Sequence, residues 1–115
     1  MKHEIVISVN SMEQCRYFYR ETLKLGDPLV DSLELCVFKL DDNGTLVLEE
    51  TKAAYLEHTS TAVFWSLETS DFDGICTDLK KNSLIAGEEY IRLGKRTRKI
   101  CDPEGNPLLL VDAAK

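Results

Sequence analysis

The sequence predicts an α+β fold in which one domain, residues 1–115, contains two βαβββ modules. Stretches of alternating apolar and polar residues are typical of strands, and two segments carry apolar residues at helical spacing. Helix starts and turns also recur along the chain, and the turn glycines Gly44 and Gly105 are 61 residues apart. A fixed period of this kind indicates internal duplication. We expect the first module within residues 1–52 and the second within residues 60–115.

The first module is expected to begin with a strand and a helix. Residues 4–9 alternate, which is typical of a strand with its more apolar face toward a core. Ser11 and Gln14 have the spacing of a capping box, so a helix is expected to begin after Ser11, and Gly26 is expected to end it. The buried side of this helix is predicted at Met12, Cys15, Phe18, Tyr19, Thr22 and Leu23.

Two strand-like stretches, residues 29–40 and 45–49, complete the first module. They are separated by Asp41-Asp42-Asn43-Gly44, in which the Asn-Gly pair favours the positive φ values of a type I′ turn. Residues 50–60 show no clear periodicity, and we interpret them as the connection between the modules.

The second module repeats this order. Residues 62–68 are predicted to form a strand, Asp71 is expected to cap a helix, and residues 89–91 are strand-like. The basic run Lys95–Lys99 is interrupted by Thr97, so we interpret it as a strand with one solvated face. The buried side of the helix is predicted at Phe72, Ile75, Cys76 and Leu79.

A hairpin is expected to end the chain. Residues 102–106 are a run of turn formers, in which Pro103 fixes φ and Gly105 tolerates a positive value. The apolar run 108–111 follows, and Pro107 stands at its first position, where a missing donor is tolerated. The sequence therefore predicts a well-covered last strand.

Composition narrows the classes of partner. The net charge of -6 and pI of about 4.9 argue against nucleic acid, because that affinity depends on clustered Lys and Arg. No apolar run approaches the roughly 20 residues that cross a bilayer, and the N-terminus shows no signal-peptide pattern. We therefore expect a cytoplasmic protein with neither a membrane nor a nucleic-acid partner.

The four cysteines, Cys15, Cys36, Cys76 and Cys101, form no C-x-x-C pair. Without a signal peptide they are expected to be reduced and mostly buried. Only Cys101, near Arg98 and Lys99, has neighbours that could favour a reactive thiolate.

Three short motifs carry a family resemblance. Phe18-Tyr19 followed by Leu25-Gly26, then Gly94-Lys95-Arg96, then the turn 102–106, resemble the vicinal oxygen chelate superfamily. That superfamily includes glyoxalases, ring-cleaving (extradiol) dioxygenases, fosfomycin-resistance enzymes and bleomycin-binding proteins. The resemblance implies a glyoxalase/bleomycin-resistance-like fold in which the sheet of each module forms half of a cup. It also implies a homodimer, with the modules paired within one chain or across subunits.

The resemblance further implies four inward-facing positions that hold a divalent metal in the metal-dependent members. In this chain they correspond to Glu4, Glu49, Phe64 and Leu109. Two of the four are apolar, whereas a catalytic divalent site normally has at least three protein ligands. The expectation is therefore no cofactor, with a divalent metal on Glu4 and Glu49 as the alternative. A further donor from His58, Ser66 or Glu68 would require a shift of register or a folded-back loop.

The residues expected to contact a ligand are Glu4, Glu49, Phe64, Lys99 and Leu109. Two other interpretations stay open, since the carboxylates can simply face solvent and the apolar side chains can fill a collapsed core. If both carboxylates lay in an apolar cup, burial and mutual repulsion would raise the pKa of at least one, unless Lys99 paired with it.

Three functions follow from the resemblance. The first is a metal-independent protein that binds a small molecule, as bleomycin-resistance proteins do. The second is a metal-dependent lyase, isomerase or dioxygenase, and the third is a non-catalytic dimeric interaction protein. No nucleophile and base are visible, because neither His3 nor His58 stands beside Ser or Cys in a motif that predicts triad chemistry. The sequence therefore assigns no catalytic residue.

Overall fold

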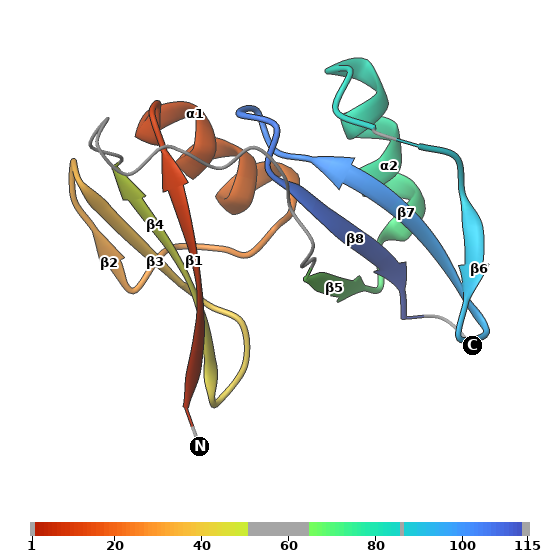
Figure 1. Ribbon diagram of the computed structural model, residues 1–115, viewed down its shortest axis with the longest axis horizontal. Helices are drawn as coiled ribbons and strands as arrows, with labels where there is room; N and C mark the ends of the chain where they lie inside the picture. The colour runs from red at the N-terminus through yellow and green to blue at the C-terminus, as the bar shows by residue number, and fades with distance from the viewer. Residues whose placement is uncertain (1, 51–64, 86, 114–115) are drawn as a thin grey trace. The chain divides into compact units, whose positions relative to one another are not determined.

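The computed structural model describes residues 2–50, 65–85 and 87–113, which form two compact units, Met1–His58 and Thr59–Lys115. Each unit follows the order β-α-β-β-β, so the predicted order of elements in two modules is confirmed (Figure 1). The first unit contains β1 (His3–Val9), α1 (Met12–Tyr17), the π-helical turn η1 (Phe18–Thr22), β2 (Val30–Asp31), β3 (Leu35–Lys39) and β4 (Gly44–Glu50). The second contains β5 (Ser66–Thr69), α2 (Phe72–Lys81), β6 (Tyr90–Arg92), β7 (Lys95–Cys101) and β8 (Pro107–Asp112).

The two sheets have the same topology. Their strand orders are β1-β4-β3-β2 and β5-β8-β7-β6, with a parallel first pair and antiparallel pairs thereafter. The matching order is what a duplicated module predicts. In each unit the helix packs on one sheet face, α1 on β3 and β4 and α2 on β8, and no helix of the described residues covers the other face.

The core of the first unit lies between α1, η1 and its sheet. Phe18 and Tyr19 meet edge to face with ring centroids 5.0 Å apart, and Tyr19 is 6.4 Å from Phe38. Aromatic pairs favour this geometry because the positive edge of one ring meets the negative face of the other. Leu46 and Leu48 are buried on the same side of the sheet, as strand alternation predicts.

The core of the second unit is made by α2 and the central strands. Every helix residue predicted as buried is buried, and Ile100, Leu108 and Leu110 are fully buried against them. In β8, Pro107 stands first, as expected, and Leu109 is partly exposed because it belongs to the opposite face.

The first helix ends earlier than predicted. Its last turn is the π-helical η1, and Lys24, not Gly26, takes the first left-handed conformation after it, with φ of 61°. The wider turn accompanies the burial of two consecutive aromatic residues, Phe18 and Tyr19, which a regular helix places 100° apart. Ser11 is the N-cap as predicted, but without the side-chain bond of a capping box.

The predicted type I′ turn at Asn43-Gly44 is wrong. Neither residue has a positive φ, and Gly44 is already the first residue of β4, opposite His3. The N–H of His3 donates to the carbonyl of Asn43 at 2.8 Å, so pairing with β1 overrides the local preference of the dipeptide. A side chain at Gly44 would place its Cβ 2.9 Å from Nε2 of His3. Glycine is therefore favoured here because there is no room for a Cβ, and not because the backbone needs a positive φ.

The last turn is formed as predicted. Asp102 is 1% exposed, and its Oδ1 accepts the N–H groups of Glu104 and Asn106, both at 2.9 Å. Its Oδ2 accepts the side-chain amide of Asn106 at 2.9 Å, and Gly105 has φ of 84°. One buried carboxylate therefore satisfies three donors of the turn.

All four cysteines lie in the described part of the chain, and none forms a disulfide. Cys15, Cys36 and Cys76 are buried, and burial raises the pKa of the Cys36 and Cys76 thiols. The expected burial is confirmed for these three thiols, and Cys101 is partly exposed. None of the described helices has the length and apolar character needed to cross a membrane.

Candidate functional site

The face of the first sheet that carries no helix, called the first face below, presents Glu4 and Glu49. Alternation puts Glu4 and Val6 of β1 on this face, and the register places them beside Thr45 and Val47 of β4. Glu49 stands further along β4, opposite Ser8. The predicted side of each strand is therefore correct for both carboxylates.

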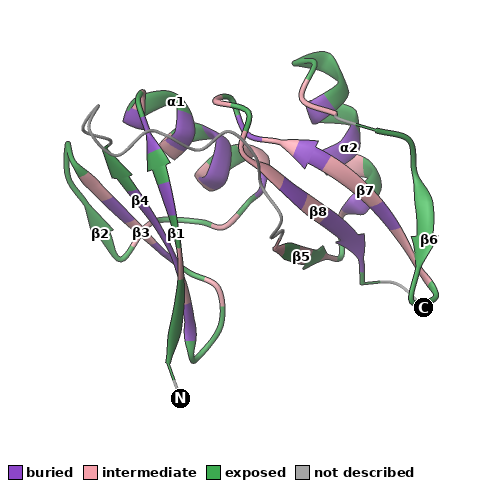
Figure 2. Ribbon diagram, viewed as in Figure 1, coloured by how far each residue is buried: buried purple, intermediate pink, exposed green. Residues whose placement is uncertain are grey.

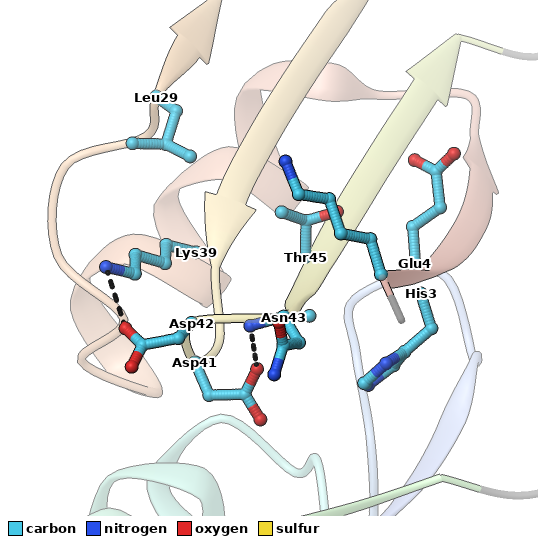
Figure 3. Close-up of a pocket in the computed structure, with 10 residues that line it drawn as sticks. His3, Glu4, Leu29, Lys39, Asp41, Asp42, Asn43 and Thr45 are labelled. Carbon is cyan, nitrogen blue, oxygen red and sulfur yellow. Dashed lines mark hydrogen bonds and ion pairs between the residues drawn. The ribbon is translucent and has the colours of Figure 1, made fainter.

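A groove of about 560 Å³ lies at the hairpin end of the first unit (Figure 3). Lys39, Thr45 and Glu4 form one row across three strands, because Thr45 pairs with both of the others. The groove is lined by Lys2, His3, Glu4, Leu29, Lys39, Asp41, Asp42, Asn43, Gly44 and Thr45. Its volume is in the range of small-molecule sites, which is about 300–1,000 Å³.

The groove contains both signs of charge and one apolar side chain. The Nζ of Lys39 is 3.6 Å from Oδ1 of Asp42, an exposed pair that a ligand anion can replace because such pairs contribute little. Glu4 and His3 point in opposite directions from β1, so the carboxylate of Glu4 belongs to the first face and the imidazole lies beside Gly44 (Figure 3). Leu29 is 63% exposed and supplies apolar surface at the rim.

Glu4 and Glu49 do not form a pair. Glu4 is opposite Thr45, four residues before Glu49 on β4, which is about 13 Å along the strand. Side chains on one face stand roughly parallel, so the two carboxylates are separated by a similar distance. At this separation the two carboxylates can neither share a proton nor bind one ion together. They are also too far apart to repel each other strongly.

The second sheet presents Lys99 and Leu109 on its own helix-free face, called the second face below. The two residues are directly opposite each other on β7 and β8, and Leu109 also pairs with Ser66 of β5. On the same face, Nζ of Lys95 is 2.6 Å from Oε1 of Glu68, so that carboxylate already has a cation. Phe64, the remaining predicted contact, lies outside the described residues.

The described residues do not fit a divalent metal site. No group of three or more His, Cys, Asp or Glu gathers in the part of the chain that the structure describes. Of the four positions that the family resemblance implies, Leu109 offers no donor atom, and Glu4 and Glu49 are too far apart to act together. His58 lies outside the described residues. The arrangement of the described residues therefore supports no metal-dependent step.

Sequence reasoning missed the groove and its residues Lys39 and Thr45. Strand alternation places both residues on the first face. Only the pairing of β1, β4 and β3 shows that they lie directly across from Glu4. It also missed a cluster around Arg96, whose guanidinium contacts Asp73 at 2.8 Å and Glu89 at 3.0 Å. These contacts lower the pKa of both carboxyls and raise that of Arg96.

The Arg96 cluster is best explained as structural. The guanidinium also lies 4.8 Å from the ring centroid of Phe72 and 3.4 Å from Oδ2 of Asp112. It therefore connects α2, the segment before β6 and the end of β8 within the second unit. Because Arg96 has the same strand parity as the buried Ile100, it belongs to the helix side and not to the second face.

Solved structures similar to this chain include enzymes and binding proteins. A glyoxalase/dioxygenase from Nostoc punctiforme is 20% identical, with 100% of this chain and 92% of that chain covered, at a TM-score of 0.77. TnmS3, an antibiotic binding protein from Streptomyces sp. CB03234, is 20% identical, with 99% and 96% covered, at 0.71. A glyoxalase / bleomycin resistance protein from Catenulispora Acidiphila DSM 44928 is 16% identical, with 99% of both chains covered, at 0.69. No protein-family model and no curated protein matches the sequence.

The chain therefore has the glyoxalase/bleomycin-resistance fold, the fold of the vicinal oxygen chelate superfamily. The fold that the three sequence motifs imply is therefore confirmed. Because all the identities are low, the likeness establishes the fold and leaves the ligand to be argued from this chain's own residues.

Proposed function

We propose that this protein binds a small organic molecule without a metal ion, as a cytoplasmic homodimer. The observation that supports this most is the groove on the first unit, where Lys39, Thr45 and Glu4 form a row beside Leu29. A ligand site typically combines apolar surface with a few placed polar groups, and this row supplies a cation, a hydroxyl and an anion.

The chemistry of the donor set supports binding without a metal. A leucine occupies one implied ligand position, and the two carboxylates are separated along their strands. Sites that hold organic molecules need no such convergence, because hydrogen bonds and apolar contacts can be distributed over a face. Neither nucleic acid nor a membrane is a partner in this proposal.

The ligand contacts are proposed on both helix-free faces. Glu4 and Glu49 are the proposed contacts on the first face, and Lys99 and Leu109 are those on the second. Phe64, beyond the described residues, is the fifth. Within the groove of the first unit, the charged side chains beside Leu29 suit an amphipathic molecule. TnmS3, the antibiotic binding protein among the similar structures, supports a small organic molecule as the ligand.

Thermal melting in excess EDTA tests the proposal. We would screen a panel of amphipathic molecules that includes bleomycin, and we expect at least one to raise the melting temperature, because a ligand that binds only the folded state stabilises it. Stabilisation that appears only when a divalent salt replaces EDTA would overturn metal independence and favour the enzyme.

Matched variants then locate the site. Glu4→Gln should weaken binding of the stabilising molecule about tenfold, the effect of losing one charge-assisted hydrogen bond. Glu13→Gln is its control, since Glu13 is an exposed carboxylate on α1. Glu49→Gln is compared with Glu50→Gln, which alters the neighbouring residue on the other face. Equal effects of every variant and its control would contradict the proposed placement.

A further inference from the structure

The outer edge of the second sheet is apolar and exposed. Among the described strands β6 pairs only with β7, and Figure 2 shows β6 as exposed. Its residues Tyr90 and Ile91 are 43% and 67% exposed, and Leu93, which follows it, is 85% exposed. An edge strand presents unpaired backbone groups that can pair with another chain. Tyrosine and large aliphatic residues beside such an edge are costly to leave in water and favour a partner.

The turn after β6 determines which backbone groups are available. Leu93 and Gly94 have φ of 51° and 77°, the two positive values of a two-residue type I′ hairpin. In such a hairpin the flanking residues, Arg92 and Lys95, exchange both backbone hydrogen bonds. Hydrogen-bonded and non-hydrogen-bonded pairs alternate along an antiparallel pair of strands, so the backbone of Tyr90 also bonds to β7. The backbone N–H and C=O of Ile91 therefore point outward from the open edge of the sheet.

The charges on this edge are self-complementary. In an antiparallel pair of two β6 strands that places Tyr90 opposite Tyr90, Glu88 of each copy stands opposite Arg92 of the other. Neither side chain has an ion pair with a described residue. Arg92 stands beside Lys95 on β7, whose own charge is paired with Glu68. In this register Glu89, which is paired with Arg96, stands opposite Ile91 of the other copy, so the two Glu89 carboxylates do not face each other.

Other registers are less favourable. If the partner strand shifts by two residues in one direction, the Glu89 residues of the two copies face each other. If it shifts by two residues in the other direction, Glu88 faces Gly94 and no ion pair forms between the copies. The edge strand of the first sheet is also a poorer candidate, since β2 has two residues and its Asp31 is paired with Arg16 at 2.6 Å.

We propose that β6 is a self-association edge, at which two copies of this chain pair antiparallel about a twofold axis through the Tyr90 pair. The inference rests on the proposed homodimer and assigns its surface. The pairing joins two four-stranded sheets into one. An interface of this length is at the small end of specific interfaces, so we expect a reversible, concentration-dependent dimer.

Cysteine cross-linking tests the register in a Cys101→Ser background, which leaves only the buried native thiols. Facing residues of a non-hydrogen-bonded antiparallel pair have Cα atoms about 4.5 Å apart, within the range of a disulfide. Tyr90→Cys should therefore give a disulfide-linked dimer on mild oxidation. Ile91→Cys should not, because in this register the two Ile91 positions are more than about 7 Å apart.

Charge reversal tests the same edge in solution. Glu88→Arg should weaken dimerisation in analytical ultracentrifugation roughly tenfold, and adding Arg92→Glu should restore it. Glu13→Arg, an exposed site on α1, is the control and should change nothing.

The outcomes separate this inference from the proposed homodimer. A dimer that is insensitive to these variants and does not cross-link through Tyr90→Cys would overturn the β6 edge and leave the homodimer intact. Preferential cross-linking through Ile91→Cys would overturn the register. A monomer at every concentration would overturn both.

Discussion

The turns that join β3 to β4 and β7 to β8 occupy equivalent places in the two modules and use their polar residues differently. In the second, the carboxylate of Asp102 is buried and accepts three hydrogen bonds from its own turn. In the first, Asp41 is exposed and accepts one bond, from the N–H of Asn43, at the side of a groove. The two equivalent turns therefore differ, because one buries its carboxylate within the turn and the other leaves its carboxylate exposed beside the groove.

The largest effect is expected from Asp102→Ala. It leaves three donors without their acceptor, and we expect the free energy of unfolding to fall by about 3 kcal/mol. Asp41→Ala should reduce it by about 0.5 kcal/mol, because its atoms are already in water. Urea denaturation measures both, and equal losses would contradict the contrast between the turns.

A second effect concerns the carboxylates of the second module. Arg96 lowers the pKa of Asp73 and Glu89 from their ordinary values of 3.8 and 4.5. When a carboxyl has a lower pKa in the folded state, it adds stability at pH values above its ordinary pKa. That stability is lost as the pH falls through the pKa of the folded state. Arg96→Met should therefore lower the melting temperature at neutral pH, and its deficit should shrink in acid. The test is a series of calorimetric melts, in which a deficit independent of pH would contradict this origin.

The two turn glycines give a smaller and more selective contrast. Gly44→Ala places Cβ against His3, whereas Gly105→Ala meets nothing within 4 Å but must adopt φ of 84°. Each should reduce the free energy of unfolding by about 1 kcal/mol, the first through a clash and the second through backbone strain. A double-mutant cycle separates them, since His3→Ala should relieve Gly44→Ala and leave Gly105→Ala unchanged. Relief of both, or of neither, would contradict these two causes.

Local pattern was sufficient to predict the modules and the faces. Because side chains on a strand alternate, Glu4 and Lys99 could each be placed on a helix-free face without knowing the fold. The final turn was predictable for a similar reason, since Asp102 and Gly105 act within five residues of each other.

What depends on distant partners could not be read from the sequence. The parallel register of β1 and β4 puts Thr45, and not Glu49, beside Glu4, and that register is set by packing of the whole sheet. The same pairing overrode the type I′ preference at Asn43-Gly44. The row of Lys39, Thr45 and Glu4, and with it the groove, exists only after three strands have paired.

The most direct test of metal-independent binding is the metal content of the purified protein, prepared without chelators, by elemental analysis. Thermal melting is then repeated with nickel, zinc, iron and manganese salts. We expect no stoichiometric metal and no rise in melting temperature, because the described carboxylates do not converge on one point. A near-stoichiometric metal, together with a rise that Glu4→Ala or Glu49→Ala abolishes, would contradict the proposal and make this protein a metal-dependent enzyme candidate.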